Sequence, residues 1–103
     1  MVTLNLEHGI GSFEVWKAAF DRDPAQRERS GVRRYRVCQP VGDPKYVIID
    51  LDFDDARAAQ AFLEAMRQVW AKAQLSPGLL REPGAAGTSP RARLLEQVAS
   101  HQY

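Results

Sequence analysis

Hydrophobic and polar residues alternate along much of the chain with the period of two that is typical of a half-buried strand. The alternation is most regular in residues 45–53, where four apolar side chains share one face and two aspartates lie on the other. Residues 40–44 are rich in proline and glycine, so a hairpin turn is predicted just before this stretch. The predicted strands are residues 2–8, 32–39, 45–53 and 93–99.

Two other stretches carry apolar residues three and four positions apart, which is the spacing of a helix with one buried face. The first begins after Ser12, a residue type that commonly caps helices, and Pro24 interrupts it. A further turn or two of helix is predicted through Arg27. The second helix begins after Asp54 or Asp55 and is the more regular of the two. Its apolar positions are Ala58, Ala59, Phe62, Leu63, Met66, Val69 and Trp70.

The order of these elements, β-α-β-β-α-β, predicts an α+β fold of the ferredoxin-like kind. Right-handed crossovers then give a four-stranded antiparallel sheet with both helices on one face and the first strand between the third and the fourth. The whole chain, residues 1–103, is expected to form a single domain, because its length is common for one. Residues 76–90 hold three of the six prolines and three of the seven glycines, which predicts a loop.

Charge and composition exclude several classes of partner. The formal net charge is only +1, so neither nucleic acid nor a membrane surface is an expected partner. The N-terminus lacks the basic region of a signal peptide, and no apolar run reaches the roughly 20 residues that cross a bilayer. The single cysteine, Cys38, rules out an internal disulfide and fits a reducing compartment. We therefore expect a cytoplasmic protein.

The face of the sheet away from the helices is expected either to be solvated or to pair with a second copy of the chain. Arg34, Arg36 and Asp50 are predicted to lie on this face. Centring the hairpin on Gly42 places Arg34 opposite Asp50, although a slip of register would change the partner. Two interpretations remain open, a solvated face with complementary charges and a homodimer interface in which these residues fix the register.

Three segments of the chain resemble a known family. They are the first helix with the sequence Phe-Glu-Val-Trp-Lys-Ala-Ala-Phe-Asp at 13–21, the strand entry at 29–32, and the strand exit at 50–54 into an alanine-rich helix. Together with the element order, they are similar to the dimeric α+β barrel superfamily. The resemblance covers nearly the whole chain, and its motifs specify a fold rather than a chemistry.

The resemblance implies a homodimer in which two sheets pair face to face. Members of the superfamily include small cyclases, cofactor-independent and antibiotic-biosynthesis monooxygenases, haem-degrading enzymes, chlorite dismutase relatives and proteins with no assigned activity. The haem-degrading members bind haem through a histidine on a helix, and neither predicted helix here contains histidine. No cofactor is therefore expected. No metal site is expected either, because the two histidines and one cysteine lie far apart in the sequence.

His8 is the candidate catalytic residue. It ends the first predicted strand beside a glycine-containing turn, and the ordinary pKa of histidine lies near neutrality, as a general base requires. The alternative is a structural histidine bonded to a nearby backbone carbonyl. The lack of an identified acidic partner favours this alternative.

Aromatic side chains at helical spacing predict a core between the helices and the sheet, and relatives of this fold bind apolar ligands in the same gap. Phe20 and Phe62 are expected to belong to a simple core. Tryptophan and tyrosine side chains also offer an N–H or a hydroxyl that can orient a ligand. The candidate pocket residues are Trp16, Tyr35, Met66 and Trp70.

These observations favour a small dimeric protein that binds an apolar, aromatic or polyketide-like molecule between sheet and helices. A cyclase or a cofactor-independent monooxygenase, with His8 as base, is the enzymatic form of this hypothesis. The alternatives are a non-catalytic protein with the same pocket and a structural dimer whose core is filled. The sequence does not choose between an enzyme and a binding protein.

Overall fold

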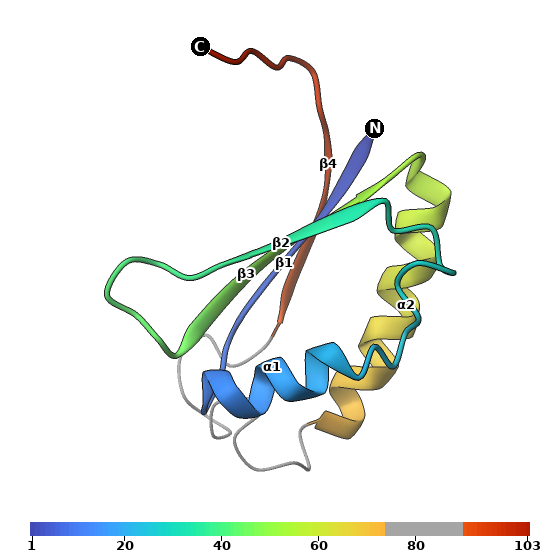
Figure 1. The fold of residues 1–103 in the computed structure, drawn as a ribbon. Coiled ribbons are helices and arrows are strands. Elements are labelled where there is room, and N and C mark those ends of the chain that lie inside the picture. Colours follow the sequence, from blue (N-terminus) through green and yellow to red (C-terminus); the bar gives the residue numbers. More distant parts are fainter. Residues whose placement is uncertain (74–89) are drawn as a thin grey trace.

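The computed structural model of the chain describes residues 1–73 and 90–103, which form an antiparallel four-stranded sheet with two helices on one face (Figure 1). The order of the elements is the predicted one. All but Pro90 of the loop predicted for residues 76–90 lies outside the described residues. The elements are β1 (Val2–Gly9), α1 (Phe13–Asp21), β2 (Arg34–Cys38), β3 (Tyr46–Phe53), α2 (Ala56–Ala73) and β4 (Arg91–Glu96).

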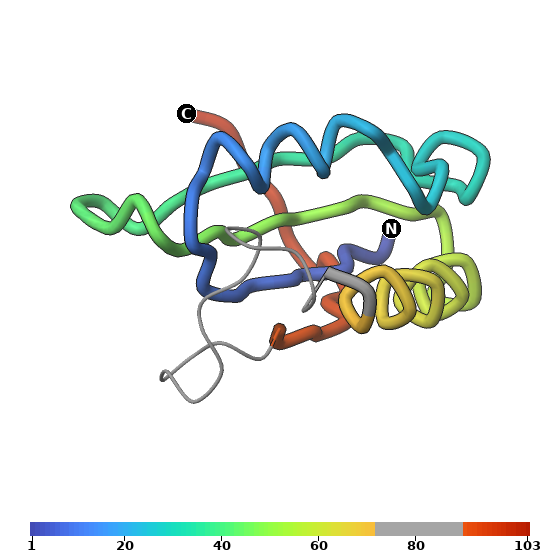
Figure 2. Tube along the Cα trace, turned by 90° about the horizontal axis from the view of Figure 1, so that it is seen from below, coloured from blue at the N-terminus to red at the C-terminus, as the bar shows by residue number. Residues whose placement is uncertain are grey.

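The strand order is β2-β3-β1-β4, so the first strand lies between the third and the fourth, as predicted. Figure 2 looks at the sheet from the helix side, where α1 lies toward β2 and α2 lies toward β1 and β4. Alternate residues of the two inner strands are buried beneath the helices, as the alternating pattern predicts. The apolar core is Leu4, Leu6, Ile10, Trp16, Val32, Val47, Ile49, Leu51, Phe53, Ala59, Phe62 and Leu63.

Side-chain oxygens cap the start of both helices. The Oγ of Ser12 accepts a hydrogen bond from the backbone N–H of Val15 at 3.4 Å, as expected for a helix N-cap. Of the two aspartates that could start α2, Asp55 takes this role, because its Oδ1 accepts from the N–H of Ala58 at 2.8 Å. Asp54 instead pairs with Arg33, at 2.6 Å.

The helical continuation predicted through Arg27 is wrong, because residues 24–30 form turns. Asp23 and Gln26 have φ values of 56° and 52°, which no α-helix accommodates. The Oδ1 of Asp23 accepts from the backbone N–H of Arg27 at 2.8 Å, so a side chain takes the place that a helical carbonyl would have. The chain therefore reverses direction between α1 and β2.

The predicted partner of Arg34 is also wrong. Arg34 lies opposite Asp52, and Arg36 lies opposite Asp50. This register centres the hairpin on Asp43 instead of Gly42, and so moves each partner by two positions. A shift of two keeps every side chain on its predicted face. The strands β2 and β4 also differ from the predicted ranges, 32–39 and 93–99, by one to three residues at their ends.

Candidate functional site

The backbone of α1 stands away from the sheet. No Cα atom of α1 lies within 8 Å of a Cα atom in any of the four described strands, whereas α2 approaches three of them. Large rings fill the distance: Trp16 stacks on Phe20 at 4.9 Å between centroids, and Phe13 lies 5.8 Å from Trp16. A helix held off by such rings leaves irregular space beneath it.

That space is an apolar cavity bounded by the sheet, both helices and the turn after α1. About 100 Å³ is open to the centres of water-sized molecules. A cavity of the order of 150 Å³ accepts a benzene ring, so this one has the scale of a single aromatic ring. Its apolar lining includes Leu6, Ile49 and Leu51 from the sheet and Trp16, Phe20, Phe62, Met66, Val69 and Trp70 from the helices.

His8 brings a polar group to this cavity. Its side chain projects from the end of β1, is only 2% exposed and lines the cavity. Its Nδ1 lies 3.1 Å from the carbonyl oxygen of Gly9, so in the neutral tautomer Nδ1 donates there and Nε2 carries the lone pair. Among the described residues, Nε2 has no hydrogen-bond partner.

Burial lowers the pKa of His8 below its usual value, and the bond to Gly9 opposes this shift without cancelling it. The imidazole is therefore neutral at neutral pH. Trp16 and Trp70 meet it edge-on, each with its centroid 6.4 Å away. A neutral imidazole held in this way can accept a proton or a hydrogen bond at Nε2.

A charged pair lies at the other end of the cavity. Asp23 and Arg27, both in the turn after α1, line it beside Pro24 and Ala25. The Nη1 of Arg27 lies 3.5 Å from the Oδ1 of Asp23. This pair is not among the residues predicted for the pocket, because the pattern of the sequence places Arg27 in a helical continuation. The aspartate before Pro24, with an arginine four positions later, is a signal that could have indicated a turn closed by an acidic side chain.

Three of the four predicted pocket residues, Trp16, Met66 and Trp70, line the cavity together with His8. Tyr35 does not line it. The residue is 46% exposed, and its ring meets that of Phe20 edge-on with 5.2 Å between centroids. The structure thus brings His8 and the two tryptophans together from three separate elements.

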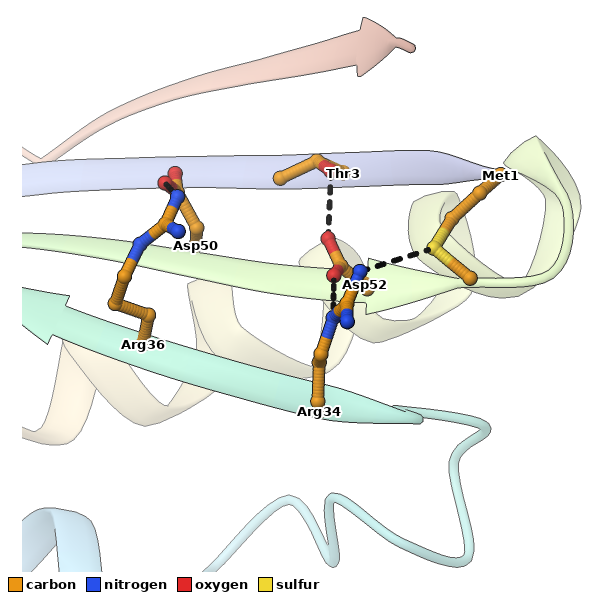
Figure 3. A network of polar contacts seen from close by, with 6 residues as sticks. All are labelled: Met1, Thr3, Arg34, Arg36, Asp50 and Asp52. Carbon is orange, nitrogen blue, oxygen red and sulfur yellow. Dashed lines mark hydrogen bonds and ion pairs between the residues drawn. The ribbon is translucent and has the colours of Figure 1, made fainter. Parts of the chain in front are cut away.

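The outer face of the sheet carries the other predicted residues, Arg34, Arg36 and Asp50. The Nη2 of Arg36 donates to the Oδ2 of Asp50 at 2.7 Å, and Asn5 donates to the other oxygen of this carboxylate at 2.7 Å. The Oδ2 of Asp52 accepts from Arg34 at 2.6 Å, and its Oδ1 accepts from Thr3 at the same distance (Figure 3). The Nη2 of Arg34 also lies 4.0 Å from the sulfur of Met1 (Figure 3).

In both ion pairs, Arg34 with Asp52 and Arg36 with Asp50, the aspartate is largely covered and the arginine is exposed. The side chain of Asp52 is 16% exposed, against 71% for Arg34. Burial acts to raise the pKa of Asp52, but the hydrogen bonds from Thr3 and Arg34 outweigh it, so the pKa lies below its usual value. The aspartates are therefore fixed parts of the sheet.

Residues 1–73 and 90–103 provide neither a metal-binding cluster nor a membrane-spanning helix. No group of three or more histidine, cysteine, aspartate or glutamate side chains in these residues could hold a metal ion. Neither helix in the same residues is long and apolar enough to span a bilayer.

No protein-family model matches the sequence, and no curated protein matches it. Solved structures do match the fold. One of them, described as "Putative antibiotic biosynthesis monooxygenase from Nitrosomonas europaea", superposes with a TM-score of 0.66 at 17% sequence identity. The match covers 96% of this chain and 100% of that chain. At this identity the likeness shows the fold alone, which is the ferredoxin-like α+β fold that the order of the elements predicts.

Proposed function

We propose that the cavity binds a small hydroxylated aromatic molecule and that His8 accepts its hydroxyl proton, as in a cofactor-independent monooxygenase or a cyclase. The observation that carries this proposal is the placement of one neutral imidazole between two tryptophan rings at an apolar end of the cavity. The similarity in fold to the monooxygenase named above supports the same class of reaction. The cavity volume favours a ligand with one ring.

The chemistry needs no group beyond the chain, the substrate and dioxygen. Nε2 of His8 takes the hydroxyl proton, which leaves an electron-rich phenolate against the indole rings. A phenol with a free ring position and one molecule of dioxygen give a quinone and one molecule of water, so atoms and electrons balance without a further reductant. The apolar lining excludes competing water from the reacting ring.

One observation favours a non-catalytic binding protein instead. The Nδ1 of His8 bonds to a backbone carbonyl and not to a carboxylate, so no carboxylate in the described residues balances the charge of the imidazolium that proton transfer would form. In that case the cavity binds the same aromatic ligands, and Nε2 accepts a hydrogen bond from the ligand without removing its proton.

Two measurements on three proteins test the proposal. Calorimetric titration with single-ring phenols should show saturable binding to the wild type, and an oxygen electrode should record dioxygen uptake with the bound phenol. His8→Gln should abolish uptake, whereas His101→Gln, which changes the other histidine outside the cavity, should retain it. Binding without uptake would select the non-catalytic alternative, and no binding would contradict both forms.

We also propose that two copies of the chain pair through the outer faces of their sheets, with Arg34, Arg36 and Asp50 in the interface. Exposed apolar side chains on β4 and in the residues that follow it support the pairing. Leu95 is 41% exposed on β4, and Val98 and Tyr103 beyond it are almost fully exposed. The C-terminal residues run away from the body of the fold, where a partner could cover them (Figure 1). The two edge strands of this face carry arginines, and the inner strand β3 carries aspartates, so the charges of one face complement those of a second copy. These residues are Arg34 and Arg36 on β2, Arg91 and Arg93 on β4, and Asp50 and Asp52 on β3.

Sedimentation velocity tests this pairing. The wild type should sediment as a dimer, and Ile48→Arg or Leu95→Arg should sediment as a monomer, because each places a charge on the paired face. Val41→Arg, at the fully exposed tip of the hairpin, is the matched control and should remain dimeric. A monomeric wild type would contradict the proposal.

We also propose a cytoplasmic location for the protein, because Cys38 is exposed and unpaired.

A further inference from the structure

Arg27 is an unusual residue for the wall of an apolar cavity. Its side chain is only 15% exposed, and it lines the cavity with Asp23, Pro24 and Ala25 of the same turn. Arginine is rarely buried unless its charge is paired, because removing a cation from water costs free energy. The position of this guanidinium therefore calls for a physical explanation.

The contacts of Arg27 fix the guanidinium but leave part of it unused. Its carbon Cζ lies 4.0 Å from the ring centroid of Phe20 and 5.0 Å from that of Tyr35. Its Nη1 donates to the carbonyl oxygen of Phe20 at 2.7 Å. In the described residues, Nε and Nη2 have no hydrogen-bond partner. One edge of a rigid, planar donor group thus remains available.

Asp23 neutralises this cation only in part. Its Oδ1 lies 3.5 Å from Nη1, which is longer than a charge-assisted hydrogen bond, and already accepts from the backbone N–H of Arg27 at 2.8 Å. Its side chain is 37% exposed, so water screens its charge. A second anion inside the cavity could approach the guanidinium more closely than Asp23 does.

Arg27 and His8 lie at opposite ends of the cavity. Arg27 stacks beside Tyr35, whose partner on β3 is Leu51, whereas His8 lies opposite Val47. These two positions on β3 are four residues apart, which is about 13 Å at a rise of about 3.3 Å per residue. Both side chains reach inward from these positions, so the space between their polar atoms suits one ring with a short side arm.

We propose that the natural ligand is an aromatic carboxylate, with its carboxylate on the free edge of Arg27 and its hydroxyl at Nε2 of His8. This inference rests on the proposed function and adds the charge and orientation of the ligand. The planar guanidinium offers two N–H groups in the geometry that a carboxylate accepts. The single ring lies between them against Trp16 and Phe20.

A pair of ligands tests the inference on the wild-type protein. We would titrate 3-(4-hydroxyphenyl)propanoate and 4-propylphenol, which differ only in a carboxylate in place of a methyl group. The acid should bind at least about tenfold more tightly, as one charge-assisted contact supplies. Equal binding, or tighter binding of the neutral phenol, would overturn the inference and leave the proposed function standing. Failure of both to bind would overturn both.

Two substitutions locate the effect at Arg27. Arg27→Gln should remove the preference for the acid, so that the ratio of the two affinities falls to about one, whereas Arg27→Lys should retain part of the preference. Asp23→Asn should make the acid bind several-fold more tightly, because it removes the competing charge. Asparagine keeps the acceptor for the N–H of Arg27 and tolerates the positive φ, so this variant should fold. A preference unchanged in both Arg27→Gln and Asp23→Asn would overturn the assignment.

Discussion

The imidazole of His8 meets the indole of Trp16 edge to face, with ring centroids 6.4 Å apart and planes inclined by 62°. Trp70 repeats this relation from α2, at the same distance and 65°. Side chains from α1 and α2 therefore fix a ring that β1 supplies, and no described carboxylate contacts it. A proton added to His8 would place a positive charge in apolar surroundings, which has consequences for stability as well as for chemistry.

Acid should destabilise the protein through His8. Its folded-state pKa is lowered, so between the usual histidine pKa near 6.5 and that lower value the unfolded chain binds more protons than the folded one. Stability must therefore fall as the pH falls through this window. Thermal melts between pH 7.5 and pH 5 should show a smaller decrease in Tm for His8→Gln than for the wild type. His101→Gln should keep the wild-type slope, and equal slopes for all three proteins would contradict the prediction.

Filling the cavity should stabilise the fold and block binding. Ala19 lines the cavity from α1, and Ala19→Leu places three more carbons in the open space. We expect a higher Tm, by a few degrees, together with loss of phenol binding, because ligand and side chain compete for one volume. Ala18→Leu, on the exposed side of the same helix, is the matched control and should change neither. A lower Tm for Ala19→Leu would contradict the prediction, because it would show that the residues lining the cavity cannot move to admit the larger side chain.

Asp52 should contribute measurably to stability, in contrast to Asp54. Asp52→Asn replaces a covered carboxylate that accepts bonds from Thr3 and Arg34, and should cost about 1 kcal/mol in urea unfolding at pH 7. Asp54→Asn breaks an exposed pair with Arg33 and should cost little. The pKa of Asp52 is lowered, so its contribution is complete above about pH 4 and disappears as the pH falls through the lowered value. An equal effect of both substitutions would be inconsistent with this.

Gly31→Ala should destabilise the fold through backbone strain alone. Gly31 has φ of 98°, and an added Cβ would meet its nearest neighbour, the Cβ of Ala58, at an ordinary 3.6 Å. There is room for the methyl group, but the conformation is unfavourable for any residue with a side chain. We expect a loss of about 1 kcal/mol or more in unfolding free energy. Gly11→Ala, where φ is not positive, should be nearly neutral.

Most of the fold could be predicted because its signals are local. The alternation in β3 and the helical spacing in α2 each identify an element and its buried face without reference to distant residues. The hairpin register is different in kind, because it depends on how the turn from Pro40 to Pro44 closes. A hydrogen bond from the N–H of Asp43 to the carbonyl of Pro40 is part of that turn, and no pattern in the strands predicts it.

Half of the candidate site could be predicted for a similar reason. His8 and the tryptophans lie on regular elements whose faces the pattern defines, so their meeting follows from the topology. Arg27 reaches the cavity only because Asp23 and Gln26 adopt positive φ and reverse the chain. Aspartate adopts that conformation more readily than most residues, but glutamine does not, so the reversal depends on the packing around it.

The central position of β1 has a consequence for biosynthesis. Of the four strands, the first to be translated pairs with the last, since Val2 lies opposite Glu96. Until β4 is translated, β1 can have a neighbour on one side only, and its other edge remains open to strands of other chains. Premature termination anywhere before β4 would therefore produce an aggregation-prone fragment with an interrupted sheet, and quality control would have to remove it.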